Sequence, residues 1–489
     1  MASTCPMDSA SNLGEGLLPK GRKGSFRARK QAAAPRAGQP NSPTPSYASS
    51  SGSSPPGELT VFDGVAIIAG TAIGGGFLAL PSLTTPMGFL PAATGLFVSW
   101  AFLALSALAY AEATLRSIVM QSAARAADAG LAEAAVDEPP ECSVLTVTRC
   151  SLGDGCSTLC SAAFAALMFV LMTAQVVKCG ELLSVLSGAP YVICCLLPSV
   201  ATGLFSFCAS TRSVEQANSL LTVALVVGFA TLIFNTAASG GSGTEIATVT
   251  NRLSFADWRW LLPTGPSWAL PVFINLISFG QTVPVVVVRF GPGRADAIRS
   301  SIVLGSFIPF VLCTLWAAVS AALLDPKAKE DVAMDPVLRM LLGRLAVALP
   351  VGMVAAGAIG TSLISNYLSL GQFVTDGIFA VSGRCTRSSR QASRVAVVVL
   401  PVMLACGGPQ LYLPLLAFAG AYPTNFLFGL VPCLACLALR KGAQGDEPKA
   451  RRGSSLQVFP GGLPLLMTLA CLASALLLVS AACAWGWLA

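Results

Sequence analysis

The chain has 489 residues and no histidine, and only 11% of its residues are charged. Without histidine it cannot assemble the His/Ser dyads of hydrolases or the histidine ligands of metal enzymes. Cys156/Cys160 and Cys433/Cys436 have turn-like spacings that resemble zinc half-sites, but the chain has no histidine to complete them. Buried thiols that act as small apolar side chains are the better interpretation. We therefore expect no metal site, no cofactor and no intramembrane enzyme.

The shortage of charge also excludes an ordinary soluble protein, in which about a quarter of the residues are charged. Hydrophobic residues make up 54% of the chain, which predicts an all-α polytopic membrane protein. Eleven apolar stretches approach the roughly 20 residues that cross a bilayer. They are residues 61–82, 88–112, 158–187, 191–209, 217–237, 267–288, 301–324, 345–378, 395–409, 412–439 and 461–487. The ninth is short, and a re-entrant hairpin around Pro401 would reduce the count to ten.

Residues 1–57 are rich in Ser, Pro, Ala and Gly, and their basic residues outnumber the acidic ones. Such a segment cannot bury a core, so we expect it to be disordered. It has no apolar stretch of the kind found in secretory signals, and its composition predicts an organellar transit peptide, plastid ahead of mitochondrion. The alternative is a cytosolic tail that only sets orientation. The plastid (chloroplast) envelope is thus the expected location, with the plasma membrane or another endomembrane as the alternative.

Residues 58–489 form the predicted transporter domain. Lys and Arg are concentrated on one side of the predicted spans, which places the N-terminus on the inner, cytosolic or stromal, side. The basic connections around 384–394 and 440–452 are interpreted as orientation signals and contacts with anionic lipid. They give no reason to expect a nucleic-acid partner, and no obligate protein partner is evident.

The first span contains an unusual run of glycines between Ala69 and Phe77. Each glycine costs a helix about 1 kcal/mol relative to alanine, so the helix should break there. Unwound backbone inside a bilayer is tolerated only where it faces protein, water or a ligand. At such a break a helix N-terminus attracts a carboxylate and freed carbonyls hold a cation. This run predicts a secondary transporter for an amino-acid-like solute.

The sixth span has a second interruption, between Pro271 and Pro284. Gly280 and Pro284 remove stiffness and a backbone donor, and Ser278 and Gln281 bring polar groups to the same depth. An inverted repeat of five plus five helices predicts a second broken helix five spans after the first. The alternative is a simple proline kink.

Several motifs occur in a characteristic order: 69–76 with Leu80-Pro81, then 305–309, then 360–363. In this order they resemble the aromatic amino acid permease family, the tryptophan- and tyrosine-specific proton symporters of bacteria and their plant and algal plastid relatives. The resemblance runs from about Val61 to Ala438 and implies a leucine-transporter-like fold with broken helices 1 and 6. Many relatives carry a histidine near the position of Gly280, and its absence here leaves substrate choice and its role in proton coupling open.

The predicted substrate site lies at the two breaks. Backbone N–H groups near Gly74, Gly75 and Gly76 would take a carboxylate, and carbonyls near Gly70 and in 278–280 would take an ammonium group. Phe279 is the expected wall for an aromatic side chain and Phe77 a second one, with ordinary packing as the alternative for both. The full predicted set is Gly70, Thr71, Ala72, Gly74, Gly75, Gly76, Ser278, Phe279, Gly280 and Gln281.

The predicted coupling site consists of Ala72, Thr361, Ser362 and Ser365. By the resemblance, Thr361 and Ser362 fall where sodium-coupled members of the larger group supply hydroxyl oxygens to a cation. Such oxygens suit a small hard cation, although small hydroxyl residues also pack helices closely. The coupling ion is expected to be H⁺, with Na⁺ as the alternative.

Ionisable residues inside membrane helices suggest function. Glu112 and Asp376 are assigned to an inner gate or proton path. Lys178 is expected to reach the outer boundary by snorkelling and to pair with Glu181, three residues on. For all of these, and for Asp63, boundary anchoring is the alternative.

The predicted function is an ion-coupled symporter of aromatic or other neutral amino acids that works by alternating access. Two alternatives remain open: an amino acid sensor that keeps the fold without flux, and a carrier for a different small organic solute.

Overall fold

The computed structural model describes residues 60–72, 74–128, 144–238, 250–265, 268–324, 334–382, 387–446 and 456–485. Every regular element in these ranges is helical. The segment 1–57, for which a transit peptide was predicted, lies outside the described residues, as do the side chains of Ala72 and Asp376.

Nine helices within the described ranges are long and apolar enough to cross a membrane. A tenth crossing is added if the bent pair at 61–87 counts as one span, and the apolar part of α14 (Arg387–Ala405) is shorter, at Gln391–Ala405. The many apolar helices establish a multi-pass membrane protein, whereas the eleventh crossing is not established. The uninterrupted long helices are α3 (Phe89–Asp128), α5 (Asp154–Ser187), α6 (Tyr191–Cys208), α7 (Thr211–Ala238), α11 (Ala295–Leu323), α13 (Leu345–Ser382) and α17 (Leu463–Ala484).

Both predicted interruptions are present. In the first span, α1 (Val61–Ala72) ends before an extended Gly74, and the chain continues as the short helix η1 (Gly75–Ala79) and α2 (Leu80–Met87), bent by 50°. In the sixth, α9 (Leu270–Leu276) and η3 (Gly280–Thr282) are separated by three non-helical residues, and α10 (Val283–Phe290) follows. The glycines therefore break the helices as their propensity requires.

The two breaks lie next to each other. The hydroxyl oxygens of Thr71 and Thr282 are 3.5 Å apart, and a Cβ at Gly76 would lie 3.0 Å from Leu276 Cδ2. The second break also packs against η5 (Gly420–Leu430), a π-helical stretch, because a Cβ at Gly280 would overlap the ring of Phe428. The interrupted segments are thus in direct contact in the interior of the helical unit.

The two halves of the first span differ in packing. In α1 the buried described residues are Gly64 and Ile68, one turn apart, and both meet α11 at Ser301 and Gly305. In η1 and α2 nearly every residue is buried. The first half is therefore held along one stripe, whereas the second half belongs to the core.

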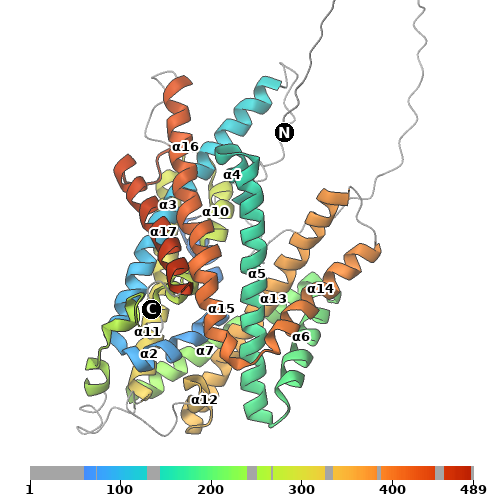
Figure 1. The fold of residues 1–489 in the computed structure, drawn as a ribbon, viewed down its shortest axis with the longest axis vertical. Coiled ribbons are helices and arrows are strands. Elements are labelled where there is room, and N and C mark those ends of the chain that lie inside the picture. The colour runs from blue at the N-terminus through green and yellow to red at the C-terminus, as the bar shows by residue number, and fades with distance from the viewer. Residues whose placement is uncertain are drawn as a thin grey trace, which may run out of the picture. The chain divides into compact units, whose positions relative to one another are not determined.

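The long helix α5 crosses the bundle from end to end (Figure 1). It begins beside α4 (Val144–Leu152), near the end where α16 (Val431–Asp446) finishes, and α12 (Pro336–Leu341) lies at the opposite end (Figure 1). Between η4 (Pro409–Leu411) and η5, helix α15 (Tyr412–Ala419) packs along α5. These elements bring side chains from distant parts of the chain to the first break.

Candidate functional site

Gly75 is the first residue after the break in span one, and its backbone is held from two sides. Its N–H donates to Ser362 Oγ in α13 at 2.6 Å, and its carbonyl accepts from the hydroxyl of Tyr412 in α15 at 2.8 Å. The polar groups that the break exposes are therefore paired with side chains from spans far along the sequence, as a bilayer interior requires.

Gln175 in α5 is a site residue that the sequence reasoning missed. Its side chain is 3% exposed, and it lies so close to Gly75 that a Cβ there would overlap its carboxamide. Its Oε1 has no hydrogen-bond partner among the described residues. A buried acceptor without a partner costs about 1–3 kcal/mol, so this oxygen is available to a donor from a ligand. A polar amide one turn before Lys178 in a membrane span was the signal that could have identified it.

The second break is more closed. The carbonyl of Phe279 accepts from both the N–H and the hydroxyl of Thr282, at 3.1 and 2.8 Å. Phe279 is 1% exposed, Ser278 is half-buried and Gln281 is exposed. The predicted carbonyl acceptors are thus partly occupied by hydrogen bonds from the short helix that follows the break.

Phe77 packs in an aromatic cluster rather than alone. Its ring stacks on Trp316 at a centroid distance of 5.4 Å and meets the edge of Phe229 at 5.6 Å. The indole N–H of Trp316 donates to the Phe77 carbonyl at 3.0 Å. The packing alternative accounts for these contacts, and they anchor η1 to α11 and α7.

The predicted coupling residues do not all reach the break. Ser362 does, through Gly75, but the Thr361 hydroxyl donates to the Gly357 carbonyl of its own helix at 2.8 Å. Ser365 is exposed on α13. In α1, Gly70 is exposed and a Cβ there would meet nothing within 4 Å. The structure therefore joins one hydroxyl of span eight to the first break.

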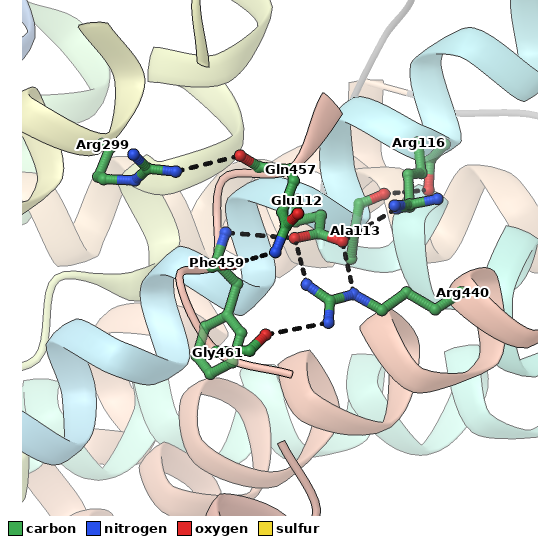
Figure 2. A network of polar contacts seen from close by, with 9 residues as sticks. Glu112, Ala113, Arg116, Arg299, Arg440, Gln457, Phe459 and Gly461 are labelled. Carbon is green, nitrogen blue, oxygen red and sulfur yellow. Dashed lines mark hydrogen bonds and ion pairs between the residues drawn. The ribbon is translucent and has the colours of Figure 1, made fainter. Parts of the chain in front are cut away.

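Glu112 was predicted to lie where span two leaves the membrane, and that position stays a prediction. Helix α3 continues to Asp128, and the Glu112 side chain is fully buried. Figure 2 shows Arg440 of α16 bonded to both of its oxygens, at 2.6 and 2.7 Å. Arg116 adds a bond at 3.1 Å and the Phe459 N–H another at 3.2 Å. Glu112 can be buried inside the bundle because these donors compensate the cost of removing its charge from water.

The segment 456–462, which leads into α17, is fastened to the same network. Arg299 of α11 donates to the carbonyls of Val458 and Gln457 at 3.0 and 3.1 Å, and Arg440 donates to that of Gly461 at 3.1 Å (Figure 2). The network thus ties α3, α11 and α16 together at one end of the bundle. Whether it opens during a transport cycle stays a prediction, as does any role of Asp376.

Lys178 was expected to snorkel to the outer boundary, and the snorkelling prediction was wrong. Its side chain is 0% exposed, and its ammonium group pairs with Glu181 at 2.9 Å and Asp335 at 2.8 Å. The predicted pairing with Glu181 is confirmed. The second carboxylate comes from Asp335 at the start of α12, and no sequence pattern places it beside Lys178.

Comparisons with known proteins agree with this geometry. The model of the tryptophan/tyrosine permease family matches residues 58–478. Tyrosine-specific transport system 1 of Haemophilus influenzae is 24% identical over 374 residues, covering 74% of this chain and 81% of the relative. The tryptophan-specific transport protein of the same organism is 24% identical over 409 residues, covering 78% and 88%. These relatives are transporters, not enzymes.

The fold is similar to that of MhsT, whose crystal structure was solved in complex with L-phenylalanine. The TM-score is 0.56 at 12% identity, and the match covers 86% of this chain and 98% of MhsT. With a family match that extends over most of the helical unit, the chain belongs to the tryptophan/tyrosine permease family.

Proposed function

We propose that this protein is a secondary active carrier that moves tryptophan, tyrosine or a related neutral amino acid together with a proton. The observation that supports this best is the contact between two interrupted membrane helices, in a chain whose relatives are tyrosine- and tryptophan-specific transporters. Sodium is the alternative coupling ion.

The proposed substrate site lies between the two breaks. Amides at Gly74 and Gly76 take the carboxylate, while the free Gln175 oxygen and the Gly70 carbonyl take the ammonium group. Phe279 borders the slot for the aromatic ring. Because Gly75 already donates to Ser362, carboxylate binding at this amide would have to compete with that hydroxyl.

The proposed coupling site is centred on Ser362. It is supported by the hydroxyl of Ser362 at 2.6 Å from the Gly75 nitrogen, which joins span eight to span one. The proposed site has three further oxygen ligands for the coupling ion, from Thr361, Ser365 and the carbonyl of Ala72. In this proposal they come together in a different conformation.

The proposed architecture has eleven spans, ten of them in two inverted halves of five and the last one peripheral. Alternating access then rocks one set of helices against the rest. The single buried stripe of α1, at Gly64 and Ile68, suits a half-helix that swings at the break. For the full chain we propose the plastid envelope as the location, with 1–57 as a transit peptide, which imaging of a tagged full-length chain tests.

The test is counterflow of labelled tyrosine and tryptophan in proteoliposomes, with separately imposed pH and sodium gradients. The proposal expects saturable exchange and accumulation driven by the pH gradient. Binding without flux would identify a sensor, and exchange driven by sodium alone would refute the proton as the coupling ion. Neither binding nor flux of either amino acid would refute the proposed substrate class.

A further inference from the structure

A buried ionic cluster joins α5, one turn beyond Gln175, to the start of α12. It consists of Lys178, Glu181 and Asp335, with N–O distances of 2.9 and 2.8 Å from the lysine to the two carboxylates. The lysine is completely buried, and the carboxylate side chains are 16% and 14% exposed. Ionisable groups in a membrane span are costly to keep and mark functional sites.

The cluster has one cation and two carboxylates, so it carries one negative charge in excess when both acids are ionised. In surroundings of low dielectric constant such an excess is expensive, and two carboxylates that share a site cannot easily ionise together. Uptake of one proton makes the cluster neutral. The composition of the cluster is therefore that of a proton-binding site.

The hydrogen bonds indicate which acid takes the proton. Asp335 also accepts from the Val337 N–H at 2.9 Å and from the Ser82 hydroxyl at 3.0 Å, and both bonds favour its ionised form. Among the described residues, Lys178 is the only hydrogen-bond donor to Glu181. Protonation of Glu181 therefore costs fewer hydrogen bonds to a carboxylate than protonation of Asp335 would.

Besides Lys178 and Asp335, two tyrosines of the described chain interact electrostatically with Glu181. They are Tyr191 on α6 and Tyr412 on α15. Both phenols are donors, to the Ala405 carbonyl at 3.0 Å and the Gly75 carbonyl at 2.8 Å, so they remain neutral hydroxyls. Neither supplies the positive charge that would balance the second carboxylate.

The cluster joins α12 to the first break. Asp335 caps α12, in which Val337 and Leu338 are buried and which packs against α13 and α2. The Lys178 ammonium lies 5.0 Å from the centre of the Tyr412 ring, and the Tyr412 hydroxyl holds Gly75. Release of Asp335 from Lys178 would thus free α12 and disturb the support of Gly75.

We propose that Glu181 is a proton-binding site that operates α12 as a gate over the broken first helix. With Glu181 protonated the cluster is neutral and α12 stays docked. With Glu181 ionised the excess charge favours separation of Asp335 from Lys178, and α12 undocks. This inference extends the proposed carrier function, but its test requires no transported substrate.

The test measures how fast a thiol-specific, membrane-impermeant reagent labels Val337→Cys, in a background whose exposed native cysteines have been replaced. Val337 is 0% exposed while α12 is docked, and Leu342→Cys, at a position 53% exposed, corrects for the reactivity of the thiol itself. The labelling ratio of Val337→Cys to Leu342→Cys should rise with pH, by up to about tenfold per pH unit, the limit for one proton.

Glu181→Gln should make this ratio low and independent of pH, because glutamine mimics the protonated acid. Asp335→Asn, which leaves a neutral Lys178–Glu181 pair, should remove the pH dependence as well, and Glu215→Gln on α7 should leave it intact. A flat ratio in the parent protein would overturn the proposal, and so would a parental pH dependence in either neutralised variant. Absence of tryptophan or tyrosine transport would refute the proposed function without altering this result.

Discussion

The contact between Gly75 and Gln175 permits a sharp test of the site. In Gly75→Ala, the new methyl group would overlap the Gln175 carboxamide, and the N–H bond to Ser362 at 2.6 Å would be displaced. Overpacking of a core costs about 1–3 kcal/mol, and the lost hydrogen bond adds about 1 kcal/mol. We expect the folded state to lose about 2–4 kcal/mol in total.

Thermal unfolding of the purified protein measures this loss. For a helical unit of this size, 1 kcal/mol corresponds to about 1 °C in Tm, so Gly75→Ala should unfold about 2–4 °C lower than the parent. The double variant Gly75→Ala/Gln175→Ala removes the overlapping amide and should recover the overpacking part, a coupling of about 1–3 kcal/mol. Gly70→Ala is the matched control, because a Cβ there meets nothing within 4 Å. A Gly75→Ala protein as stable as the parent, or a double variant no better than the single one, would refute the reasoning.

Three further predictions concern contacts around the breaks and at the end of α16. Ser362→Ala should lower tryptophan counterflow about 5- to 10-fold, the equivalent of one hydrogen bond. Thr222→Ala should change it less than twofold, because that hydroxyl bonds within α7 and lies outside the proposed sites; equal effects would contradict the assignment of Ser362. Glu112→Gln leaves Arg440 without its charged partner and should lower the free energy of unfolding by about 3–5 kcal/mol, which is visible as a lower Tm. An unchanged Tm would show that the network does not contribute to stability. Trp316→Phe keeps the ring stack but loses the indole hydrogen bond, so we expect a loss of about 1 kcal/mol in unfolding free energy, and a loss several times larger would mean that the stack itself is disturbed.

The two breaks could be predicted from the sequence because the signal is local. Glycines at 74–76 and around 280 oppose a helix wherever it is placed, and the structure interrupts both spans there. The contact between Thr71 and Thr282 could not be predicted in detail, since it joins residues 211 positions apart.

The burial of Glu112 and of Lys178 has a common physical basis. A charge in an apolar run was interpreted as a boundary, because burying an unpaired charge is prohibitive. Here the charges are paired, Glu112 with Arg440 and Lys178 with Asp335, through partners more than a hundred residues away. A single sequence does not reveal such partners, so Lys178 was placed at the surface.

Gln175 was missed for a related reason. A neutral amide in a membrane span carries no charge that would mark it as a functional residue. Its place in the site becomes evident only because α5 brings it against Gly75. Its importance depends on packing, which the pattern of apolar residues does not encode.

The most direct test of the central claim is an experimental structure of the full chain with L-tryptophan bound. The account predicts ligand density between the two interrupted helices, with the carboxylate at the amides of 74–76, the ammonium group within hydrogen-bond distance of Gln175 Oε1 and the ring beside Phe279. Continuous first and sixth helices, or a ligand bound away from both breaks, would contradict it.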